Sequence, residues 1–167
     1  MIELRNVVVA YESRVILDSI NLTIDDGETL VILGGSGSGK STLLRLLIGL
    51  QRPTSGQIIV DGTDITTLSE DEFNTVRRKM GMVFQYSALF DSMSVGENVA
   101  FGLRQHTDLG DDEIKRIVAE RLDWVGLKGY ESYMPNELSG GMKKRVSLAR
   151  AIALDPSLIL YDEPSSG

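Results

Sequence analysis

One stretch constrains the fold of this chain more than any other: residues 34–42, which read GGSGSGKST. The apolar, partly β-branched run that precedes it, residues 29–33, is typical of a buried strand. The leucines and isoleucine of residues 43–48 favour an amphipathic helix after it. The alternative is a flexible glycine/serine linker, but a linker would not lie between a buried strand and such a helix. We therefore predict a strand, loop and helix that match the phosphate-binding pattern G-x-x-x-x-G-K-[ST].

Each residue type in this loop has a chemical reason. Glycine permits backbone conformations that a side chain would forbid, so successive N–H groups can point at phosphate oxygens, where the helix N-terminus adds its positive dipole. Lys40 can reach the β- and γ-phosphates, and the Ser41 hydroxyl can ligate Mg²⁺. A nucleoside triphosphate site is predicted, and its residues are Gly34, Gly35, Ser36, Gly37, Ser38, Gly39, Lys40, Ser41 and Thr42.

Composition excludes several other classes of protein. With 167 residues, the chain can form one compact core, with or without a small subdomain. Its net charge of -7 argues against a nucleic-acid-binding surface, and the absence of cysteine excludes disulfides, thiolate chemistry and cysteine-ligated metals. Residues 1–5 do not resemble a signal peptide, and no apolar run approaches membrane-spanning length. We expect a protein of cytosolic character that reaches a membrane only through a partner, and we expect its single histidine, His106, in a surface loop.

Apolar periodicity predicts mostly strands in the first half of the chain. Turns are expected at residues 25–28 and 61–62, where glycine supplies positive φ. A helix is expected to begin at the cap Ser69 and to end near Lys79. The strands are expected at residues 2–10, 15–17, 20–24, 57–60 and 80–85.

From residue 86 the pattern becomes helical. Helices are predicted from Ser94 to Leu103, from residue 111 to the stop at Gly126, and from Ser139 to Ala153. A last strand is predicted at residues 158–161. The expected organisation is a nucleotide-binding core in residues 1–85, an inserted helical subdomain in 86–138, and a closing helix and strand in 139–167.

That last strand ends at two carboxylates, Asp162 and Glu163. An aspartate at the end of such a strand can lie beside a phosphate-binding loop and hold Mg²⁺, and the adjacent glutamate can polarise a water for attack on the γ-phosphate. A surface Asp-Glu pair that closes a strand is equally common. This motif alone leaves both interpretations open.

Residues 137–142, ELSGGM, resemble the signature of the ABC-type ATPases, which usually reads LSGGQ. A serine cap with two glycines is the simpler alternative, but the position shortly before the Asp-Glu strand favours the signature. The resemblance covers essentially the whole chain and implies an α/β fold: a P-loop NTPase core with a mostly parallel sheet, an N-terminal antiparallel β subdomain and an inserted α-helical subdomain. It also implies that a glycine nest presents a hydroxyl and amides to the γ-phosphate held by a second subunit, through Ser139, Gly140, Gly141 and Met142.

The same resemblance assigns two further residues. Tyr11 matches the aromatic residue that stacks on adenine, although on its own it would be an ordinary strand-end tyrosine. Gln85 matches the Q-loop glutamine, which contacts Mg²⁺ or the lytic water and senses the transporter partner. The implied catalytic residues are thus Glu163 and Gln85, and the implied Mg²⁺ ligands are Ser41, Gln85 and Asp162.

Met142 lies at a position usually held by glutamine, and this departure indicates a subfamily of the ABC-type ATPases. Together with FQYSALF at residues 84–90 and NVAF at 98–101, it resembles the ATPases of Mla/Mce-type lipid transport systems. This implies an ATP-hydrolysing subunit, paired as a homodimer, at the cytoplasmic face of the inner membrane. There it would energise a permease for phospholipid or other hydrophobic cargo.

The sequence ends at residue 167, directly after the Asp-Glu segment. Members of this family continue into a D-loop aspartate, more strands and helices, and a switch histidine, and His106 is far from the matching place. We therefore expect a cassette without its final third, which binds ATP, hydrolyses it poorly and exposes apolar faces of its sheet.

Two other functions stay open. A soluble ABC-type ATPase acting on DNA or ribosomes is one, but residues 86–135 lack the heptads of a coiled coil, the chain has one cassette, and it is acidic. A non-catalytic nucleotide-binding module is the other. Binding without turnover would distinguish it from an ATPase.

Overall fold

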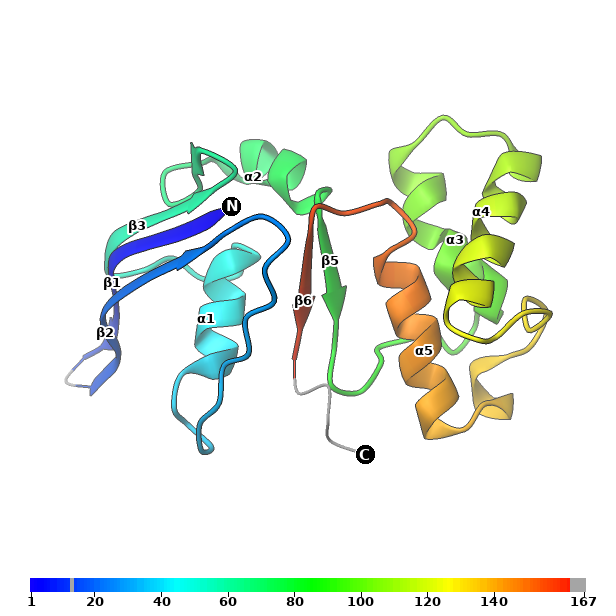
Figure 1. Cartoon of the computed structure of the whole chain (residues 1–167), viewed down its shortest axis with the longest axis horizontal. Helices are drawn as coiled ribbons and strands as arrows, with labels where there is room; N and C mark the ends of the chain where they lie inside the picture. The colour runs from blue at the N-terminus through cyan, green and yellow to red at the C-terminus, as the bar shows by residue number, and fades with distance from the viewer. Residues whose placement is uncertain (13, 163–167) are drawn as a thin grey trace. The chain divides into compact units, whose positions relative to one another are not determined.

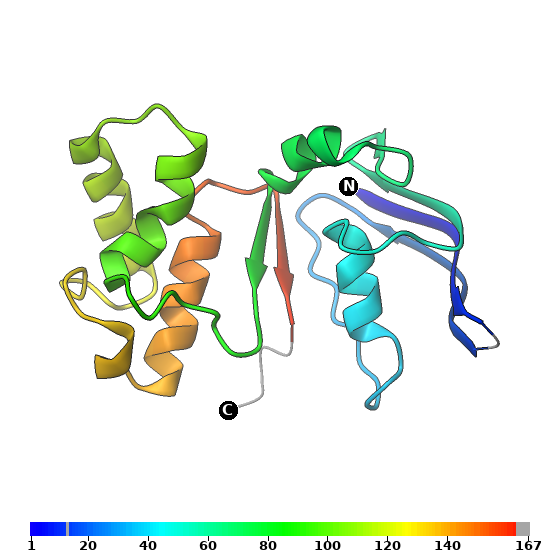
Figure 2. The same cartoon turned by 180° about the vertical axis from the view of Figure 1, so that it is seen from behind.

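The computed structural model describes residues 1–12 and 14–162, and the chain forms two compact units, Met1–Thr75 and Val76–Gly167. Figures 1 and 2 show their elements from two sides. The three-part domain division expected from the sequence stays a prediction. The first unit holds β1 (Ile2–Tyr11), β2 (Arg14–Ile24), α1 (Lys40–Leu47), β3 (Ser55–Val60), β4 (Thr63–Asp64) and most of α2 (Glu70–Arg77). The second holds β5 (Met80–Val83), α3 (Val95–His106), α4 (Asp111–Trp124), the 3-10 turn η1 (Pro135–Glu137), α5 (Gly140–Ala151) and β6 (Leu158–Tyr161).

An antiparallel sheet of order β2-β1-β3-β4 forms the first unit, as predicted for the N-terminal part. Its central strand buries Ile2 and Leu4, then Val7 and Val9, so the buried positions change from even to odd numbers. A β-bulge causes this change, because the register shifts between Leu4 and Val7 around Asn6, whose φ is 50°. The extra residue keeps both apolar pairs on one face of the sheet.

The predicted tight turn between β3 and β4 is confirmed. Asp61 and Gly62 have φ values of 47° and 77°, the left-handed pair that a two-residue hairpin requires. The turn at residues 25–28 is also present, since the Glu28 N–H donates to the Asp25 carbonyl at 3.2 Å and Gly27 has φ 77°.

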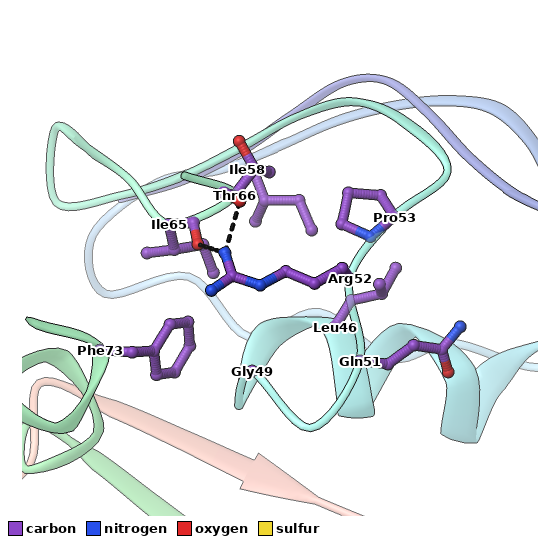
Figure 3. A pocket seen from close by; sticks show the side chains of 9 residues that line it. All are labelled: Leu46, Gly49, Gln51, Arg52, Pro53, Ile58, Ile65, Thr66 and Phe73. Carbon is purple, nitrogen blue, oxygen red and sulfur yellow. Dashed lines mark hydrogen bonds between the residues drawn. The ribbon is translucent and has the colours of Figure 1, made fainter. Parts of the chain in front are cut away.

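Helix α1 completes the core of the first unit. It lies along one face of the sheet (Figures 1 and 2) and buries Leu43, Leu46 and Leu47. The small cavity beside it, lined by Leu46, Ile58, Phe73 and Arg52 among others (Figure 3), encloses ≈ 10 Å³. That volume holds at most one water molecule, so this cavity is part of the packing and offers no ligand site.

The prediction of a buried strand at residues 29–33 is wrong. No strand is present there, and Leu30, Val31, Ile32 and Leu33 are 40%, 70%, 44% and 87% exposed. A strand exists only where its N–H and C=O groups pair with a neighbour, and within the described residues this run pairs with none. Local apolar character alone therefore leaves it extended and uncovered.

The second unit contains a parallel strand pair and a helical body. Strands β5 and β6 pair in register from Met80 and Leu158 to Val83 and Tyr161, which confirms the expected parallel arrangement. Strand β6 is less buried than predicted, because within the described residues it is paired along one edge only and Tyr161 is 42% exposed. Helices α3, α4 and α5 pack around one apolar cluster, which includes Val95, Val99, Leu103, Ile114, Val118, Leu122, Leu127 and Val146.

Polar side chains define where these helices begin. Ser94 and Glu97 form a capping box on α3: the Glu97 N–H donates to Ser94 Oγ at 3.2 Å, and the Ser94 N–H donates to Glu97 Oε2 at 2.7 Å. His106 is exposed, as expected, but it closes α3 and does not lie in a loop. Across the part of the chain that the structure describes, no helix has the length and apolarity needed to cross a bilayer.

Candidate functional site

The glycine-rich loop meets α1 with the backbone geometry that an anion site needs. Gly37 and Gly39 have φ values of 77° and 95°, and α1 begins at Lys40. The Leu43 N–H donates to the Gly39 carbonyl at 2.9 Å, which is the first bond of the helix. The amides before it have no intrahelical acceptor, because the first turn of any helix leaves them free to bind another group. The loop and the helix end thus offer several N–H donors in one place.

Two glycines in this loop have little room for a side chain. A Cβ on Gly39 would lie 2.7 Å from Leu17 Cδ2, and the left-handed φ adds strain of its own. A Cβ on Gly34 would lie 2.6 Å from Ser38 Oγ. Gly39 therefore lets the loop pack closely on β2, and Gly34 lets it close on itself.

The Lys40 ammonium lies over the loop. Its Nζ donates to the carbonyl oxygens of Gly34, at 2.7 Å, and Gly35, at 2.9 Å. This positive charge and the helix amides form a cradle whose donors suit a polyphosphate. Ser41 is exposed at the start of the same helix, and its hydroxyl is an oxygen of the kind that Mg²⁺ prefers.

Tyr11 lies in the same unit, at the end of β1. It pairs with Arg14 across the β1–β2 hairpin, and its side chain is 54% exposed. An exposed ring at a strand end offers a flat apolar face to a ligand.

Gln85 and Asp162 lie together in the second unit. Both follow the carboxyl ends of the parallel strands β5 and β6, and the Asp162 N–H donates to the Val83 carbonyl at 3.0 Å. They line a hollow of ≈ 160 Å³ together with Val83, Phe84, Lys144, Arg145, Leu148 and Tyr161, and burial raises the pKa of the Tyr161 hydroxyl. Glu163, the expected base, lies outside the described residues.

The donor chemistry fits Mg²⁺ better than a metal held entirely by the protein. Within residues 1–12 and 14–162, no three His, Cys, Asp or Glu side chains gather into a metal-binding group. Magnesium commonly takes one or two carboxylates and completes its shell with water and phosphate oxygens. The Gln85 carbonyl and the Asp162 carboxylate in the second unit, and the Ser41 hydroxyl in the first, are oxygen donors of this kind.

The turn after Gln85 is held by long-range contacts that sequence reasoning missed. Ser87 and Ala88 have left-handed φ values of 62° and 46°, and both carbonyls accept hydrogen bonds from the half-buried Arg150 guanidinium, whose pKa burial lowers. Asn98, fully buried, accepts from the Phe90 N–H at 2.8 Å and donates to the Phe90 carbonyl at 3.1 Å. A lone polar residue on an apolar helix face is the signal that points to Asn98.

The signature-like segment forms the N-terminus of α5. Ser139 caps the helix by accepting from the Met142 N–H at 3.3 Å, while Gly140 and Gly141 are exposed, with open space where a Cβ would lie. The Met142 side chain packs against the helical core. An apolar residue at this position is therefore explained by packing, and the two glycines are exposed at the start of the helix.

A comparison with known families matches residues 17–166 to a family model described as ABC transporter. The chain belongs to the ABC transporter family. The intermembrane phospholipid transport system ATP-binding protein MlaF of Haemophilus influenzae is 49% identical over 167 residues, which is 100% of this chain and 63% of that protein. The probable ribonucleotide transport ATP-binding protein mkl of Mycobacterium tuberculosis is 50% identical over 166 residues, 99% of this chain and 46% of that protein.

A solved structure also resembles this ABC-family chain. The dimeric ATP-binding cassette MJ0796 in a post-hydrolysis state, bound to ADP and Pi, matches with a TM-score of 0.89 and 36% identity, over 99% of this chain and 75% of that one. The expected fold class, an α/β P-loop NTPase core of ABC-ATPase type, is confirmed, as is the expected likeness to the Mla-type ATPases. The chain spans about 63% and 46% of the lengths of the two curated relatives.

The predicted site residues of this ABC-family chain fall into two groups. Tyr11 and residues 34–42 belong to the first unit, whereas Gln85, Asp162 and the Ser139 segment belong to the second. Tyr11, Asp162 and Ser139 lie next to element ends, and residues 34–42 lead into α1 without the predicted strand before them. Assembly of both groups into one site is part of the proposal below.

Proposed function

We propose that this chain forms the ATP-binding and ATP-hydrolysing part of an ABC transporter subunit. The observation that carries the proposal is the cradle at the start of α1, where Lys40 Nζ lies 2.7 Å and 2.9 Å from two carbonyls of a glycine loop with left-handed turns. A triphosphate would replace those carbonyls as the partner of Lys40 and would accept from the helix amides.

The remaining binding roles follow from the element ends. Tyr11 would stack on the adenine ring, since its exposed face lies at the end of β1. Ser41, Gln85 and Asp162 would hold Mg²⁺, which when bound supplies positive charge to the phosphate oxygens. We also propose that the chain is divided into a nucleotide-binding core in residues 1–85, an inserted helical subdomain in 86–138, and a closing helix and strand in 139–167.

Hydrolysis would be an in-line displacement on the γ-phosphorus. Gln85 would orient a water, and Glu163 would take its proton as the water oxygen bonds to phosphorus and the bond to the bridging oxygen of ADP breaks. The N-terminus of α5, with Ser139, Gly140, Gly141 and Met142, would donate to the γ-phosphate held by a second copy. The exposed glycine amides at this helix end support that role.

A homodimer of cassettes and a membrane permease are the proposed partners. The dimeric solved relative supports the first, and the name of the MlaF relative supports a permease that moves phospholipid or other hydrophobic cargo. The chain would then act as a peripheral subunit at the cytoplasmic face of the inner membrane. Because the mkl relative is named for ribonucleotide transport, the cargo is tested separately below.

Calorimetric binding of Mg-ATP, followed by phosphate release, tests the proposed activity. Lys40→Ala is expected to abolish binding, and the matched control that keeps it is Lys128→Ala, a change of an exposed lysine in the turn after α4. Equal binding by wild type and Lys40→Ala would contradict the proposal. Lysine-dependent turnover supports an ATPase, whereas lysine-dependent binding without turnover supports a nucleotide-binding module.

The cargo requires a separate measurement. The chain is combined with its permease in proteoliposomes, and ATP hydrolysis is measured with added fluorescent phospholipid or with a ribonucleotide. Stimulation by phospholipid alone is the expected result. Stimulation by ribonucleotide alone would overturn the lipid assignment and leave the ATPase assignment intact.

A further inference from the structure

Among the residues that the structure describes, the end of β1 that carries Tyr11 has a strand partner on one edge only. On the edge that faces β2, Tyr11 pairs with Arg14. On the edge that faces β3, the ladder stops at Val8 and Ser55, two residues before Ala10. The backbone groups of Ala10 on that edge need another partner, because an unpaired edge frays.

The side chain of Thr54 supplies that partner. The Ala10 N–H donates to Thr54 Oγ1 at 2.9 Å, and Thr54 Oγ1 lies 3.4 Å from the Ala10 carbonyl, to which it donates. The Thr54 N–H itself donates to the Val8 carbonyl at 2.8 Å, directly after the ladder ends. Since a hydroxyl both donates and accepts, one side chain imitates the pair of bonds that a neighbouring strand would make.

The loop that presents Thr54 is itself held in place. Pro53 fixes its own φ, and Arg52 donates to the carbonyls of Ile65 and Thr66 beyond β4 (Figure 3). Arg52 also donates to the carbonyl of Leu68. The loop is therefore held on one side by Arg52, which bonds to the segment after β4. On the other side it is held by Thr54, which bonds to the backbone of Ala10. Thr54 is 44 residues from Ala10 in sequence.

We propose that Thr54 is a positioning residue for Tyr11 and thereby sets the affinity of the protein for the adenine base. This inference rests on the proposed stacking of Tyr11 on adenine. The Tyr11 ring is 54% exposed and is followed by Glu12 with φ 48°, so the direction of the ring depends on the backbone of the strand end. Loss of the Thr54 hydroxyl would free that backbone, and ordering it again on binding would cost affinity.

Binding calorimetry with two ligands tests the inference, namely Mg-ATP and Mg-tripolyphosphate, which lacks the base. Thr54→Val keeps the shape of the side chain and removes the hydroxyl with both of its bonds to Ala10. It is expected to weaken ATP binding by about fivefold, the order of magnitude of a typical net hydrogen-bond contribution. Affinity for tripolyphosphate is expected to stay unchanged. Thr54→Ser, which keeps the hydroxyl, is expected to bind ATP as the wild type does.

Tyr11→Ala distinguishes the stacking role of Tyr11 from the positioning role of Thr54. It is expected to weaken ATP binding, and adding Thr54→Val to it is expected to cause no further loss, because both changes act through the same contact. If Tyr11→Ala leaves ATP affinity unchanged, the stacking role fails and the inference fails with it. If Tyr11→Ala weakens binding and Thr54→Val does not, only the role of Thr54 is overturned.

Two further results decide between positioning and general support of the fold. An equal loss of tripolyphosphate affinity in Thr54→Val would overturn the inference, because the damage would then extend to the phosphate loop. If Thr54→Val does not fold, the hydrogen-exchange rate of the Ala10 amide is measured in the wild type and in Thr54→Ser instead. A slow, protected Ala10 amide in both supports the contact, and fast exchange in the wild type overturns it.

Discussion

Arg150 on α5 donates a hydrogen bond of 2.8 Å to the carbonyl oxygen of Ala88, 62 residues earlier in the chain. A second bond, of 3.2 Å, runs to the carbonyl of Ser87. The helix that begins at the signature-like segment is thereby attached to the turn that follows Gln85. Both carbonyls belong to residues with left-handed backbone, so the guanidinium stabilises a conformation that these residues disfavour by themselves.

Arg150→Met is expected to lower the free energy of unfolding by about 2 kcal/mol, because two carbonyls lose a charged donor. Urea unfolding followed by circular dichroism measures the change. Arg116→Met, an exposed arginine on α4 whose contact is a 3.6 Å surface ion pair with Glu113, is the matched control and is expected to change little. Equal effects of the two substitutions would show that the Arg150 contacts contribute nothing specific.

Gly49→Ala is expected to destabilise the first unit by about 3 kcal/mol, from left-handed strain and overpacking together. Gly49 has φ 70°, and a Cβ there would lie 2.5 Å from Cζ of the buried Phe73. Thermal unfolding measures the loss. Gly141→Ala serves as control, since Gly141 lies in the first turn of α5 with open space where a Cβ would lie. A tolerated Gly49→Ala would mean that Phe73 moves aside at little cost.

Ser147→Ala is expected to raise the free energy of unfolding by about 1 kcal/mol. Ser147 is fully buried on α5, and within the described residues its hydroxyl has no hydrogen-bond partner. Alanine removes the unpaired group and suits a helix interior better. Chemical denaturation compares it with Ser94→Ala, which removes the cap of α3 and is expected to lose about 1 kcal/mol. Destabilisation by both would indicate that Ser147 has a partner.

The capping box of α3 predicts a pH dependence. The pKa of Glu97 is lowered from its ordinary value of 4.5 by hydrogen bonds from the backbone N–H and the hydroxyl of Ser94. Because the folded pKa is below the unfolded one, the carboxylate stabilises the fold above pH 4.5, and this contribution disappears as the pH falls through the folded value. Wild type and Glu97→Gln should therefore differ in the free energy of unfolding at neutral pH. The difference should shrink as the pH falls below 4.5 and through the pKa of Glu97 in the folded protein. A difference that stays constant down to pH 3 would contradict the assignment.

Local patterns predicted the elements well. The apolar alternation of β1, the Ser94 and Ser139 caps and the glycine loop before α1 each depend on neighbours within a few residues, and each is found where expected. The buried strand at residues 29–33 failed because its burial depends on a strand partner, which no local pattern supplies.

The contacts that organise the candidate site were hidden for the same reason. Thr54 acts on Ala10 across 44 residues, and Arg150 acts on Ala88 across 62. Nothing in the neighbourhood of either residue distinguishes it from an ordinary loop threonine or helix arginine. Motifs identified the groups that would face the substrate, whereas the residues that hold them in place became visible only once the chain was folded.

The bulge at Asn6 makes β1 sensitive to length. The backbone oxygen of Asn6 would lie 2.3 Å from a Cβ on Gly56. The Asn6 N–H donates to Asn21 Oδ1 at 2.9 Å, and Asn6 Oδ1 accepts from Asn21 Nδ2 at 3.0 Å, so the extra residue contacts both neighbouring strands. Replacement by aspartate or glycine keeps the residue count and the left-handed turn. Deletion would restore a regular alternation and turn Val7 and Val9 toward solvent, so at this point of the chain an indel is more damaging than a substitution.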